Sequence, residues 1–364
     1  MGEPNAVLVT GASGLVGAEV VTRLRARGIP VVVLTHRTPQ IVDSRGTRVA
    51  AAEFTGGADE VAFVTGDIRQ PGFGLDPETL TLLRERVGTL VHSAATTDFD
   101  APERDYAELN VGGTEHAAEL ARSWDIPLVY VSTAYVCGRR DGFIEEDFAP
   151  GSDSFGNGYE RSKYLAEQHV RNLPGLRWTV VRPGIVTGLT ESGAIRDYKN
   201  LYTVVKLIVE GKLRTLPGRY DATLTFAPVD YVADVIVAAT TQFDRAQGKT
   251  CHAVGANATS LRAMSEIFAE YPSFEVARFV PATTFDPAEL DAVEREYYLR
   301  IGAQYTNYFN SRRDFGTAAA TELLGTPPPD TGPDYLRVLL DHCLETGYLG
   351  TPLASIEEVL QCWS

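Results

Sequence analysis

Tyr159 and Lys163 lie four residues apart in the stretch NGYERSKYLAEQ, which follows a glycine-containing loop and begins a predicted helix. This spacing places both side chains on one helix face, within reach of the same small ligand. A free tyrosine has a pKa near ~10, and a neighbouring ammonium group favours the phenolate and lowers that pKa. The pair predicts an acid–base group, although the same spacing also occurs on ordinary helix faces.

Two hydroxyl residues precede this pair in the stretch VYVSTAYVCG. Ser132 and Thr133 lie at the end of a predicted strand. The carboxyl ends of parallel strands border the crevice in which nucleotide cofactors bind. A hydroxyl group at this edge can orient a substrate oxygen.

Three glycines stand at the first predicted strand-to-helix turn, in VLVTGASGLVGAEVVTRL. Gly11, Gly14 and Gly17 form the pattern GxxGxxG. Glycine at such a turn lets the backbone approach a pyrophosphate, whose charge is stabilised by the free N–H groups of the helix start. The position of the motif predicts a dinucleotide-binding site rather than a tight structural turn.

The end of the second predicted strand, VVVLTHR, bears on the choice of cofactor. An acidic residue there would bind the ribose 2′-hydroxyl of NAD(H), but the chain has Arg37 instead, which suits a 2′-phosphate. We therefore expect NADP(H) to be preferred, with NAD(H) possible if Arg37 is only a solvated cation. Asp67, after the third strand, could accept from the adenine amino group or could be a plain turn residue.

The elements that must position these residues alternate along the first half of the chain. Short β-branched apolar runs separated by helical patterns predict a parallel sheet with crossover helices. The predicted strands are 6–10, 31–34, 61–66, 89–94, 128–133 and 178–184, and the predicted helices are 14–27, 106–123 and 159–172. This is the pattern of an α/β, doubly wound parallel sheet, the Rossmann fold.

The alternation breaks after about residue 188, where a polar stretch is followed by an apolar helix. Residues 224–255 predict one more helix and a strand that returns to the main sheet. We expect an NADP-binding Rossmann domain at 1–190 plus about 224–255. The remainder, about 191–223 and 256–364, is predicted to be a smaller, mostly helical substrate-binding part.

The charge composition of the chain limits the classes of partner that it can bind. The chain has 364 residues, 33 basic and 48 acidic, for a net charge of −15, and no basic run that could neutralise a series of phosphates. We expect no nucleic acid and no membrane partner, and any anionic ligand must be held locally.

The four cysteines, Cys137, Cys251, Cys343 and Cys362, lack metal-ligand spacing and are expected to be free thiols. No basic leader or ~18-residue apolar run is evident, so a cytoplasmic location is expected.

With these motifs in place, the chain resembles an extended short-chain dehydrogenase/reductase. The motifs that carry the resemblance are TGASGLVG (10–17), GDI (66–68), HSAA (92–95), LNVGGT (109–114), VSTAYVCG (131–138), YERSK (159–163) and RPG (182–184). They appear in the family's order and cover about residues 6 to 190. The resemblance implies hydride transfer to a carbonyl substrate and a possible homodimer through helices 106–123 and 159–172.

The resemblance also implies a role for individual residues. Tyr159 matches the proton donor, Lys163 the lysine that binds the nicotinamide ribose and tunes the tyrosine, and Thr133 the hydroxyl that orients the carbonyl, with Ser132 as the neighbouring candidate. Asn110 matches the asparagine of the fourth helix, but it could simply satisfy backbone groups. The implied cofactor contacts are Gly11, Ser13, Gly14, Leu15, Val16, Gly17, Arg37, Asp67, Ile68, Ala94, Ala95, Asn110, Tyr159, Lys163, Pro183 and Gly184.

The reaction within the family is narrowed by local sequence. The sugar dehydratases carry an Asp-Glu pair where Ala134 and Tyr135 stand here, and the cofactor sensors lack the Tyr/Lys pair, so catalysis without dehydration is expected. Two stretches, 91–121 and 129–138, are similar to the fatty acyl-CoA and carrier-bound thioester reductases. We expect an NADPH-dependent reductase of an acyl thioester or derived aldehyde. The alternatives are a ketone reductase of a natural-product intermediate and a nucleotide-sugar epimerase.

Two groups of residues near the C-terminus each have two possible roles. The segment EREYYLRIGAQYTNYFN concentrates aromatic residues that could line an acyl pocket or form the core face of a helix. Arg312 and Arg313 could bind a phosphate of pantetheine or a nucleotide, or they could be solvated.

Overall fold

A parallel sheet of eight strands forms the centre of the computed structural model, which describes residues 6–37, 39–57, 59–146 and 154–350. All six predicted strands are present, with ends that differ from the prediction by at most two residues. In spatial order the strands are β15 (Thr250–Ala253), β10 (Trp178–Pro183), β8 (Leu128–Val131), β7 (Val87–His92), β1 (Ala6–Thr10), β2 (Val31–Thr35), β6 (Val61–Thr65) and β5 (Ala52–Glu53). The predicted return of residues 224–255 to the sheet is confirmed, because β15 pairs with β10.

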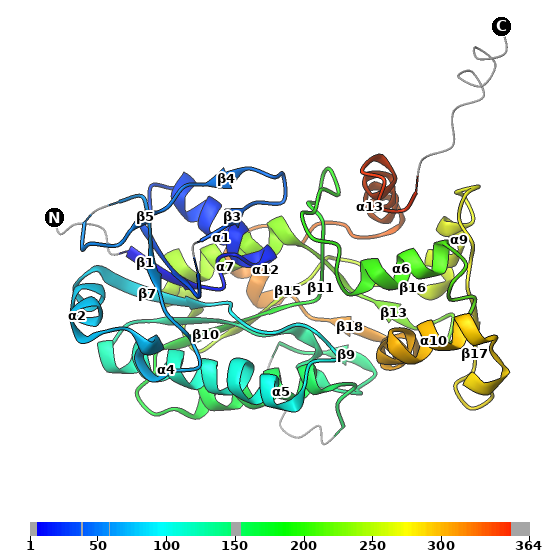
Figure 1. Cartoon of the computed structure of the whole chain (residues 1–364), viewed down its shortest axis with the longest axis horizontal. Helices are drawn as coiled ribbons and strands as arrows, with labels where there is room; N and C mark the ends of the chain where they lie inside the picture. Colours follow the sequence, from blue (N-terminus) through cyan, green and yellow to red (C-terminus); the bar gives the residue numbers. More distant parts are fainter. Residues whose placement is uncertain (1–5, 38, 58, 147–153, 351–364) are drawn as a thin grey trace, which may run out of the picture.

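Helices cover both faces of this sheet (Figure 1). The helices on one face are α1 (Leu15–Ala26), α7 (Val229–Thr241) and α12 (Ala318–Leu324), and those on the other are α2 (Pro77–Arg86), α4 (Gly113–Trp124) and α5 (Gly158–Asn172). Strand side chains alternate between the faces, so Val7 and Val9 pack toward α1 while Leu8 packs toward α4. The predicted Rossmann fold is confirmed.

Short helical segments join these elements. They are α3 (Glu103–Asp105), α8 (Phe243–Ala246), the 3₁₀ turns η1 (Pro71–Gly74), η3 (Ala134–Cys137), η4 (Pro287–Glu289) and η5 (Gly302–Tyr305), and the π-helix η2 (Tyr106–Gly112). The predicted helix 106–123 therefore begins with η2 and continues as α4.

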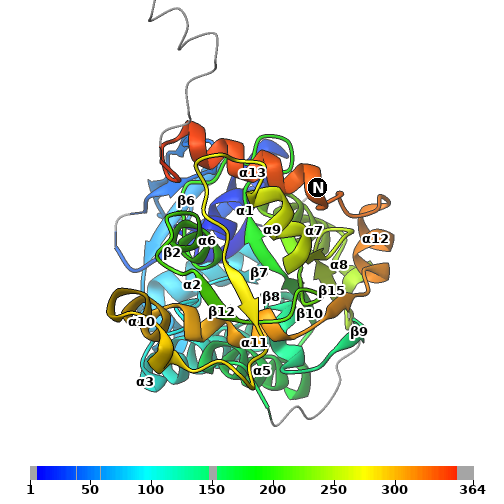
Figure 2. The ribbon, with the colours of Figure 1, turned by 90° about the vertical axis from the view of Figure 1, so that its right-hand side faces the viewer.

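A smaller region lies beyond the carboxyl ends of the strands and faces the viewer in Figure 2. Its helices are α6 (Leu201–Val209), α9 (Leu261–Phe268), α10 (Ala292–Arg300), α11 (Thr306–Asn310) and α13 (Pro333–Glu345). They share one apolar core, to which α6 contributes seven of its nine residues.

This region also contains short strand pairs that the sequence pattern did not predict. The pairs are β11 (Ile185–Thr187) with β14 (Phe226–Pro228), β12 (Thr215–Pro217) with β17 (Arg278–Val280), β13 (Thr223–Leu224) with β16 (Thr259–Ser260), and β9 (Gly142–Ile144) with β18 (Arg313–Phe315). A further pair, β3 (Ile41–Val42) with β4 (Arg48–Val49), follows β2. Strands of two or three residues are too short to show a periodic pattern.

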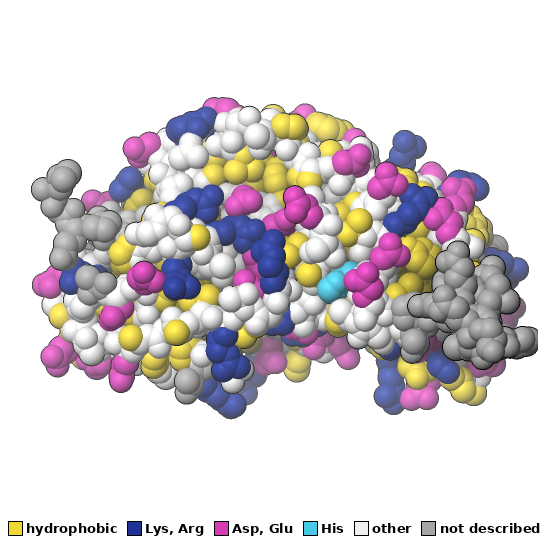
Figure 3. All heavy atoms as spheres, turned by 90° about the horizontal axis from the view of Figure 1, so that it is seen from above, with side chains coloured by type: hydrophobic (Ala, Val, Ile, Leu, Met, Phe, Trp, Pro, Cys, Tyr) yellow, Lys and Arg dark blue, Asp and Glu magenta, His cyan; other side chains and the backbone are white. Residues whose placement is uncertain are grey.

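The surface mixes charges of both signs. On the face shown in Figure 3, acidic and basic side chains are interspersed. No helix within the described ranges has the length and apolar character needed to cross a membrane. Cys251 and Cys343 are buried free thiols and Cys137 is a half-buried one, whereas Cys362 lies outside the described residues.

Candidate active site

The glycine turn between β1 and α1 is closed to any larger residue. Gly11 has a φ of +74°, and a Cβ there would lie 2.7 Å from the backbone nitrogen of Ala94. A Cβ at Gly17 would lie 2.2 Å from the Gly11 carbonyl oxygen. Helix α1 has Gly14 as its N-cap residue, with no side-chain cap and no acidic residue in its first turn. Its N–H groups and positive dipole end therefore suit a pyrophosphate, as the GxxGxxG motif predicted.

Two cavities meet at this turn. An inner cavity of about 350 Å³ extends toward Tyr159, and an outer cavity of about 930 Å³ extends toward Arg37. The predicted residues that line the outer cavity are Gly11, Ser13, Gly14, Arg37, Asp67, Ile68, Ala94 and Ala95. Those that line the inner one are Gly11, Ser13, Gly14, Leu15, Val16, Gly17, Ala95, Thr133, Tyr159, Lys163, Pro183 and Gly184. The two cavities together have the arrangement that an extended dinucleotide requires.

Asn110 is the predicted cofactor residue that lines neither of these two cavities. Its side chain is fully buried, accepts a hydrogen bond from the Thr96 N–H at 2.8 Å and donates to the Thr96 carbonyl at 3.1 Å. It also donates to the Ser162 hydroxyl at 2.9 Å. Asn110 therefore ties the loop after β7 to α5, which corresponds to the alternative of satisfying backbone groups.

The far end of the outer cavity is cationic. Arg37 is exposed there beside His36 and Arg69. The Arg69 guanidinium donates hydrogen bonds to both carboxylate oxygens of Asp67, the shortest at 2.6 Å, and thereby lowers the pKa of the Asp67 carboxyl. Sequence reasoning missed Arg69, although its position two residues after Asp67 was a usable signal.

Arg196 is a second arginine that sequence reasoning missed, and it contacts the glycine turn. Arg196, in the loop before α6, donates to the Ser13 carbonyl at 2.8 Å and to the Val42 carbonyl. It also lines the inner cavity. The polar loop 189–200 showed no regular motif, so its contact with the turn could not be read from the sequence.

Tyr159 is half-buried in the wall of the inner cavity, near the start of α5. Its ring stacks on Phe99 at a centroid distance of 5.7 Å. Burial raises the pKa of the Tyr159 phenol to about 12, and the Thr133 hydroxyl only partly opposes this rise. The predicted lowering of this pKa by Lys163 is therefore wrong for the structure described here, because desolvation of the phenolate dominates.

Lys163 points from α5 toward the end of β8. Its ammonium donates to the Val131 carbonyl at 2.7 Å and lies 4.4 Å from the centre of the Tyr130 ring. The side chain lines the inner cavity but is only 2% exposed. Burial lowers the pKa of Lys163 to about 7, although the Glu167 carboxylate partly opposes this shift.

Thr133 and Ser132 differ in what their hydroxyls bind. The Ser132 hydroxyl donates to Glu167 at 2.8 Å. The Thr133 hydroxyl makes two long contacts with the backbone, a donation to the Pro183 carbonyl at 3.4 Å and an acceptance from the Tyr135 N–H at 3.3 Å. Thr133, which interacts with the Tyr159 phenol, is thus the residue better able to bind a substrate oxygen.

A buried ion network lies behind this set. Arg182 on β10 donates to Glu167 at 2.6 and 3.1 Å, and Arg171 donates to it at 2.9 Å. Burial alone would raise the pKa of the Glu167 carboxyl, but the Arg182 guanidinium holds it below its usual range. The network fixes α5 against the sheet, and sequence reasoning missed it.

The aromatic C-terminal segment contributes side chains to both the inner cavity and the apolar core. Tyr305 and Tyr308 line the inner cavity, where both rings lie within 6 Å of the Phe99 ring centre. Tyr298 and Phe309 are buried in the core, and Tyr297 packs against it. Tyr305 and Tyr308 are also buried members of this core, so the segment forms a core face and two of its tyrosines border the inner cavity as well.

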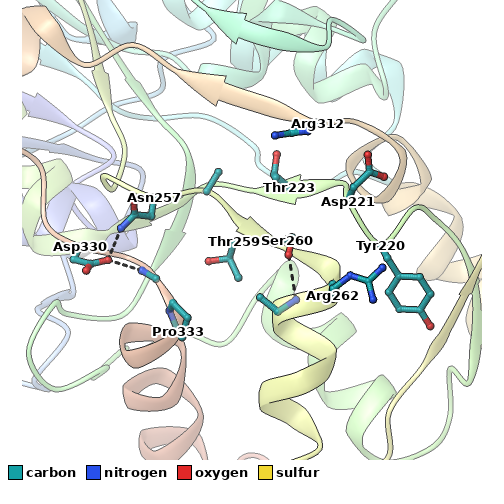
Figure 4. A pocket seen from close by; sticks show the side chains of 13 residues that line it. Tyr220, Asp221, Thr223, Asn257, Thr259, Ser260, Arg262, Arg312, Asp330 and Pro333 are labelled. Atoms are coloured by element: carbon teal, nitrogen blue, oxygen red, sulfur yellow. Dashed lines mark hydrogen bonds between the residues drawn. The ribbon is translucent and has the colours of Figure 1, made fainter.

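The two candidate phosphate-binding arginines lie apart from these cavities. Arg313 is buried and donates to the Gly138 and Arg140 carbonyls, both at 2.9 Å, so it is not the solvated side chain that one alternative expected, and its guanidinium already binds backbone carbonyls. Arg312 lies with Arg262 in a separate surface hollow of about 510 Å³ (Figure 4). Within the described ranges, no group of three His, Cys, Asp or Glu residues is arranged to hold a metal ion.

Comparison with known proteins identifies the family of the chain. The model of the NAD-binding family described as Male sterility protein matches residues 9–236. The chain belongs to this family of extended short-chain dehydrogenase/reductases, and it is an NAD(P)-dependent oxidoreductase.

Individual relatives are large enzymes or parts of them. The chain is 28% identical over 250 residues to the isonitrile lipopeptide synthase of Streptomyces coeruleorubidus, covering 65% of the chain and 16% of that protein. It is 28% identical over 259 residues to the L-2-aminoadipate reductase large subunit of Penicillium chrysogenum, covering 64% and 18%. The chain thus spans less than a fifth of the length of these curated relatives.

A solved structure matches nearly the whole chain. The terminal R domain from the myxalamid PKS-NRPS biosynthetic pathway superposes with a TM-score of 0.80 at 25% identity. The match covers 97% of this chain and 94% of that one. The resemblance predicted from the motifs is confirmed, and it extends beyond residue 190 to the C-terminal region.

Buried Lys163 should make stability depend on pH in a specific way. Its pKa is about 7 in the folded protein against an ordinary 10.5, so between these values the unfolded chain binds the proton more strongly. The free energy of unfolding therefore decreases as the pH falls, by up to about 1.4 kcal/mol per pH unit. The measurement is the melting temperature of Lys163→Met and of the wild type from pH 9 to pH 6. As the pH falls, we expect the melting temperature of the variant to rise relative to that of the wild type.

Lys249, which is 44% exposed, provides the control. Its replacement with Met should give a melting-temperature difference that stays constant over the same pH range. A constant difference for Lys163→Met as well would show that Lys163 keeps its charge throughout.

Proposed function

We propose that the protein reduces an acyl thioester, bound to CoA or to a carrier protein, with NADPH. The observation that carries the proposal is the position of the Tyr159 phenol. It stands beside the Thr133 hydroxyl in a cavity whose one wall is the glycine turn and whose other wall is aromatic. Family membership and the names of the relatives, which include an aminoadipate reductase, support the same chemistry.

Tyr159 and Thr133 act together on the substrate carbonyl. Both hydroxyls donate hydrogen bonds to its oxygen and stabilise the negative charge that develops there. Because burial keeps the pKa of Tyr159 high, the phenol remains protonated at neutral pH and can deliver its proton. When bound, the nicotinamide supplies the hydride that adds to the carbonyl carbon.

A thioester requires one further step. After hydride addition and protonation of the oxygen, the carbon carries both a hydroxyl and the sulfur substituent. Loss of the hydroxyl proton and cleavage of the carbon–sulfur bond release an aldehyde and a thiol. The Lys163 amine, held at the end of β8, would bind the cofactor ribose beside this centre.

The outer cavity supports a preference for NADPH. Arg37, His36 and Arg69 all line this cavity and could meet a 2′-phosphate, and Arg69 also holds Asp67. A chain with a net charge of −15 needs such local cations to hold a polyanion.

Thioester reduction can be measured directly with the purified chain. We expect NADPH absorbance to fall and free thiol to appear together when NADPH is mixed with a medium-chain acyl-pantetheine thioester. NADPH oxidation with the matching aldehyde but not with the thioester would identify a simple carbonyl reductase. Inactivity with both, with no net cofactor loss, would favour a ketone substrate or sugar epimerisation.

Replacing Tyr159 with Phe should lower kcat by at least about 10²-fold, because the variant lacks the proton donor but retains the ring. The dissociation constant for NADPH, measured by fluorescence titration, should change little. Tyr164→Phe is the matched control on the same helix, since Tyr164 lines neither cavity. Full activity in Tyr159→Phe would refute the assigned role.

Replacing Arg37 with Ala should weaken NADPH binding by about 10- to 100-fold, as expected for the loss of a charged hydrogen bond. NADH binding should be nearly unchanged, because NADH has no 2′-phosphate. Arg45→Ala, at an exposed arginine outside the outer cavity, should alter neither. Equal losses for both cofactors in Arg37→Ala would show that the phosphate is bound elsewhere.

A further inference from the structure

Leu201, the first residue of α6, separates the inner cavity from two small voids in the apolar core. It lines the inner cavity, a void of about 30 Å³ and a void of about 10 Å³. Among the residues that the structure describes, no other lines all three of these spaces. The Leu201 side chain is 7% exposed and therefore occupies the boundary between them.

The two voids are enclosed by apolar side chains of α6, α9 and α13, which lie together in Figure 2. Val205 and Met264 line both voids, Leu336 and Leu339 line the larger one, and Phe268 lines the smaller one. Apolar voids of this size stay dry, so their walls lack van der Waals partners on one side. A methylene group placed there would gain these contacts.

Tyr202, the neighbour of Leu201, also borders the inner cavity and the larger void, but it is anchored. Its hydroxyl accepts a hydrogen bond from the Gly188 N–H at 2.9 Å. The apolar Leu201 side chain has no such anchor, so its size sets the end of the cavity beside Tyr202.

Three charged side chains of the inner cavity come from the segment just before Leu201. Arg196, Asp197 and Lys199 line the cavity, and Lys199 is exposed to solvent. Ile185 and Leu224 continue the apolar wall toward Leu201. A polar pantetheine arm suits the charged opening, whereas an apolar acyl chain suits the wall that ends at Leu201.

We propose that the substrate is a linear apolar acyl thioester and that Leu201 sets the longest acyl chain the enzyme accepts. The inference rests on the proposed thioester reduction and adds a substrate class and a specificity-determining residue to it. Shortening Leu201 joins the voids to the inner cavity and makes room for additional methylene groups. Enlarging it removes room.

The test is a chain-length profile of kcat/KM, measured by NADPH consumption with linear acyl-pantetheine thioesters of even length from C4 to C14. For Leu201→Ala we expect the optimum to move to longer chains, with about a fourfold gain in kcat/KM for each additional methylene buried. For Leu201→Phe we expect it to move to shorter chains. Leu201→Val, with a smaller shift toward longer chains, replaces the Ala variant if that variant does not fold.

Leu207→Ala is the matched control, because Leu207 is an equally buried leucine of α6 that lines none of the three spaces. It should keep the wild-type profile, and all variants should keep the wild-type KM for NADPH. An unchanged profile in both folded Leu201 variants, with an active wild type, would overturn this inference alone. A wild type that reduces no thioester of any length would overturn the proposed function as well.

Discussion

The Glu167 carboxylate is the buried charge on which the geometry of the site depends. It accepts hydrogen bonds from Ser132 at the end of β8, from Arg182 on β10 and from Arg171 one turn further along α5. Two guanidinium groups offset the desolvation of one carboxylate, and its remaining negative field acts on Lys163. Removing one member of such a network leaves an uncompensated buried charge, which costs about 3–5 kcal/mol.

Burial acts in opposite directions on the pKa values of the two titratable groups that α5 places at the inner cavity. Burial raises the pKa of the Tyr159 phenol and lowers that of the Lys163 amine, so both shifts favour the neutral forms. A proton donor must stay protonated until the hydride arrives, and a high phenol pKa serves this need. The pair on α5 is therefore an acid–base device whose resting state is set by burial rather than by attraction between the two side chains.

The chemistry could be predicted from the sequence because it depends on local motifs. The glycine turn, the strand ends and the Tyr/Lys spacing each fall within a few residues, and their backbone geometry follows from local rules. The sign of the Tyr159 shift was mispredicted, because desolvation depends on Phe99 and other residues distant in the chain. The buried position of Arg313 was likewise invisible, since its partners at Gly138 and Arg140 lie more than 170 positions away.

The same difference between local motifs and long-range packing explains why the reaction class could be predicted from the sequence and the substrate could not. The cofactor side of the inner cavity is built from the first 190 residues, whereas Leu201, Leu224, Tyr305 and Tyr308 come from later segments. These later residues meet through non-local packing of short elements, including strand pairs of two or three residues. A sequence motif can therefore identify a carbonyl reductase, but the length and polarity of its substrate follow only from how α6, η5 and α11 close over the cavity.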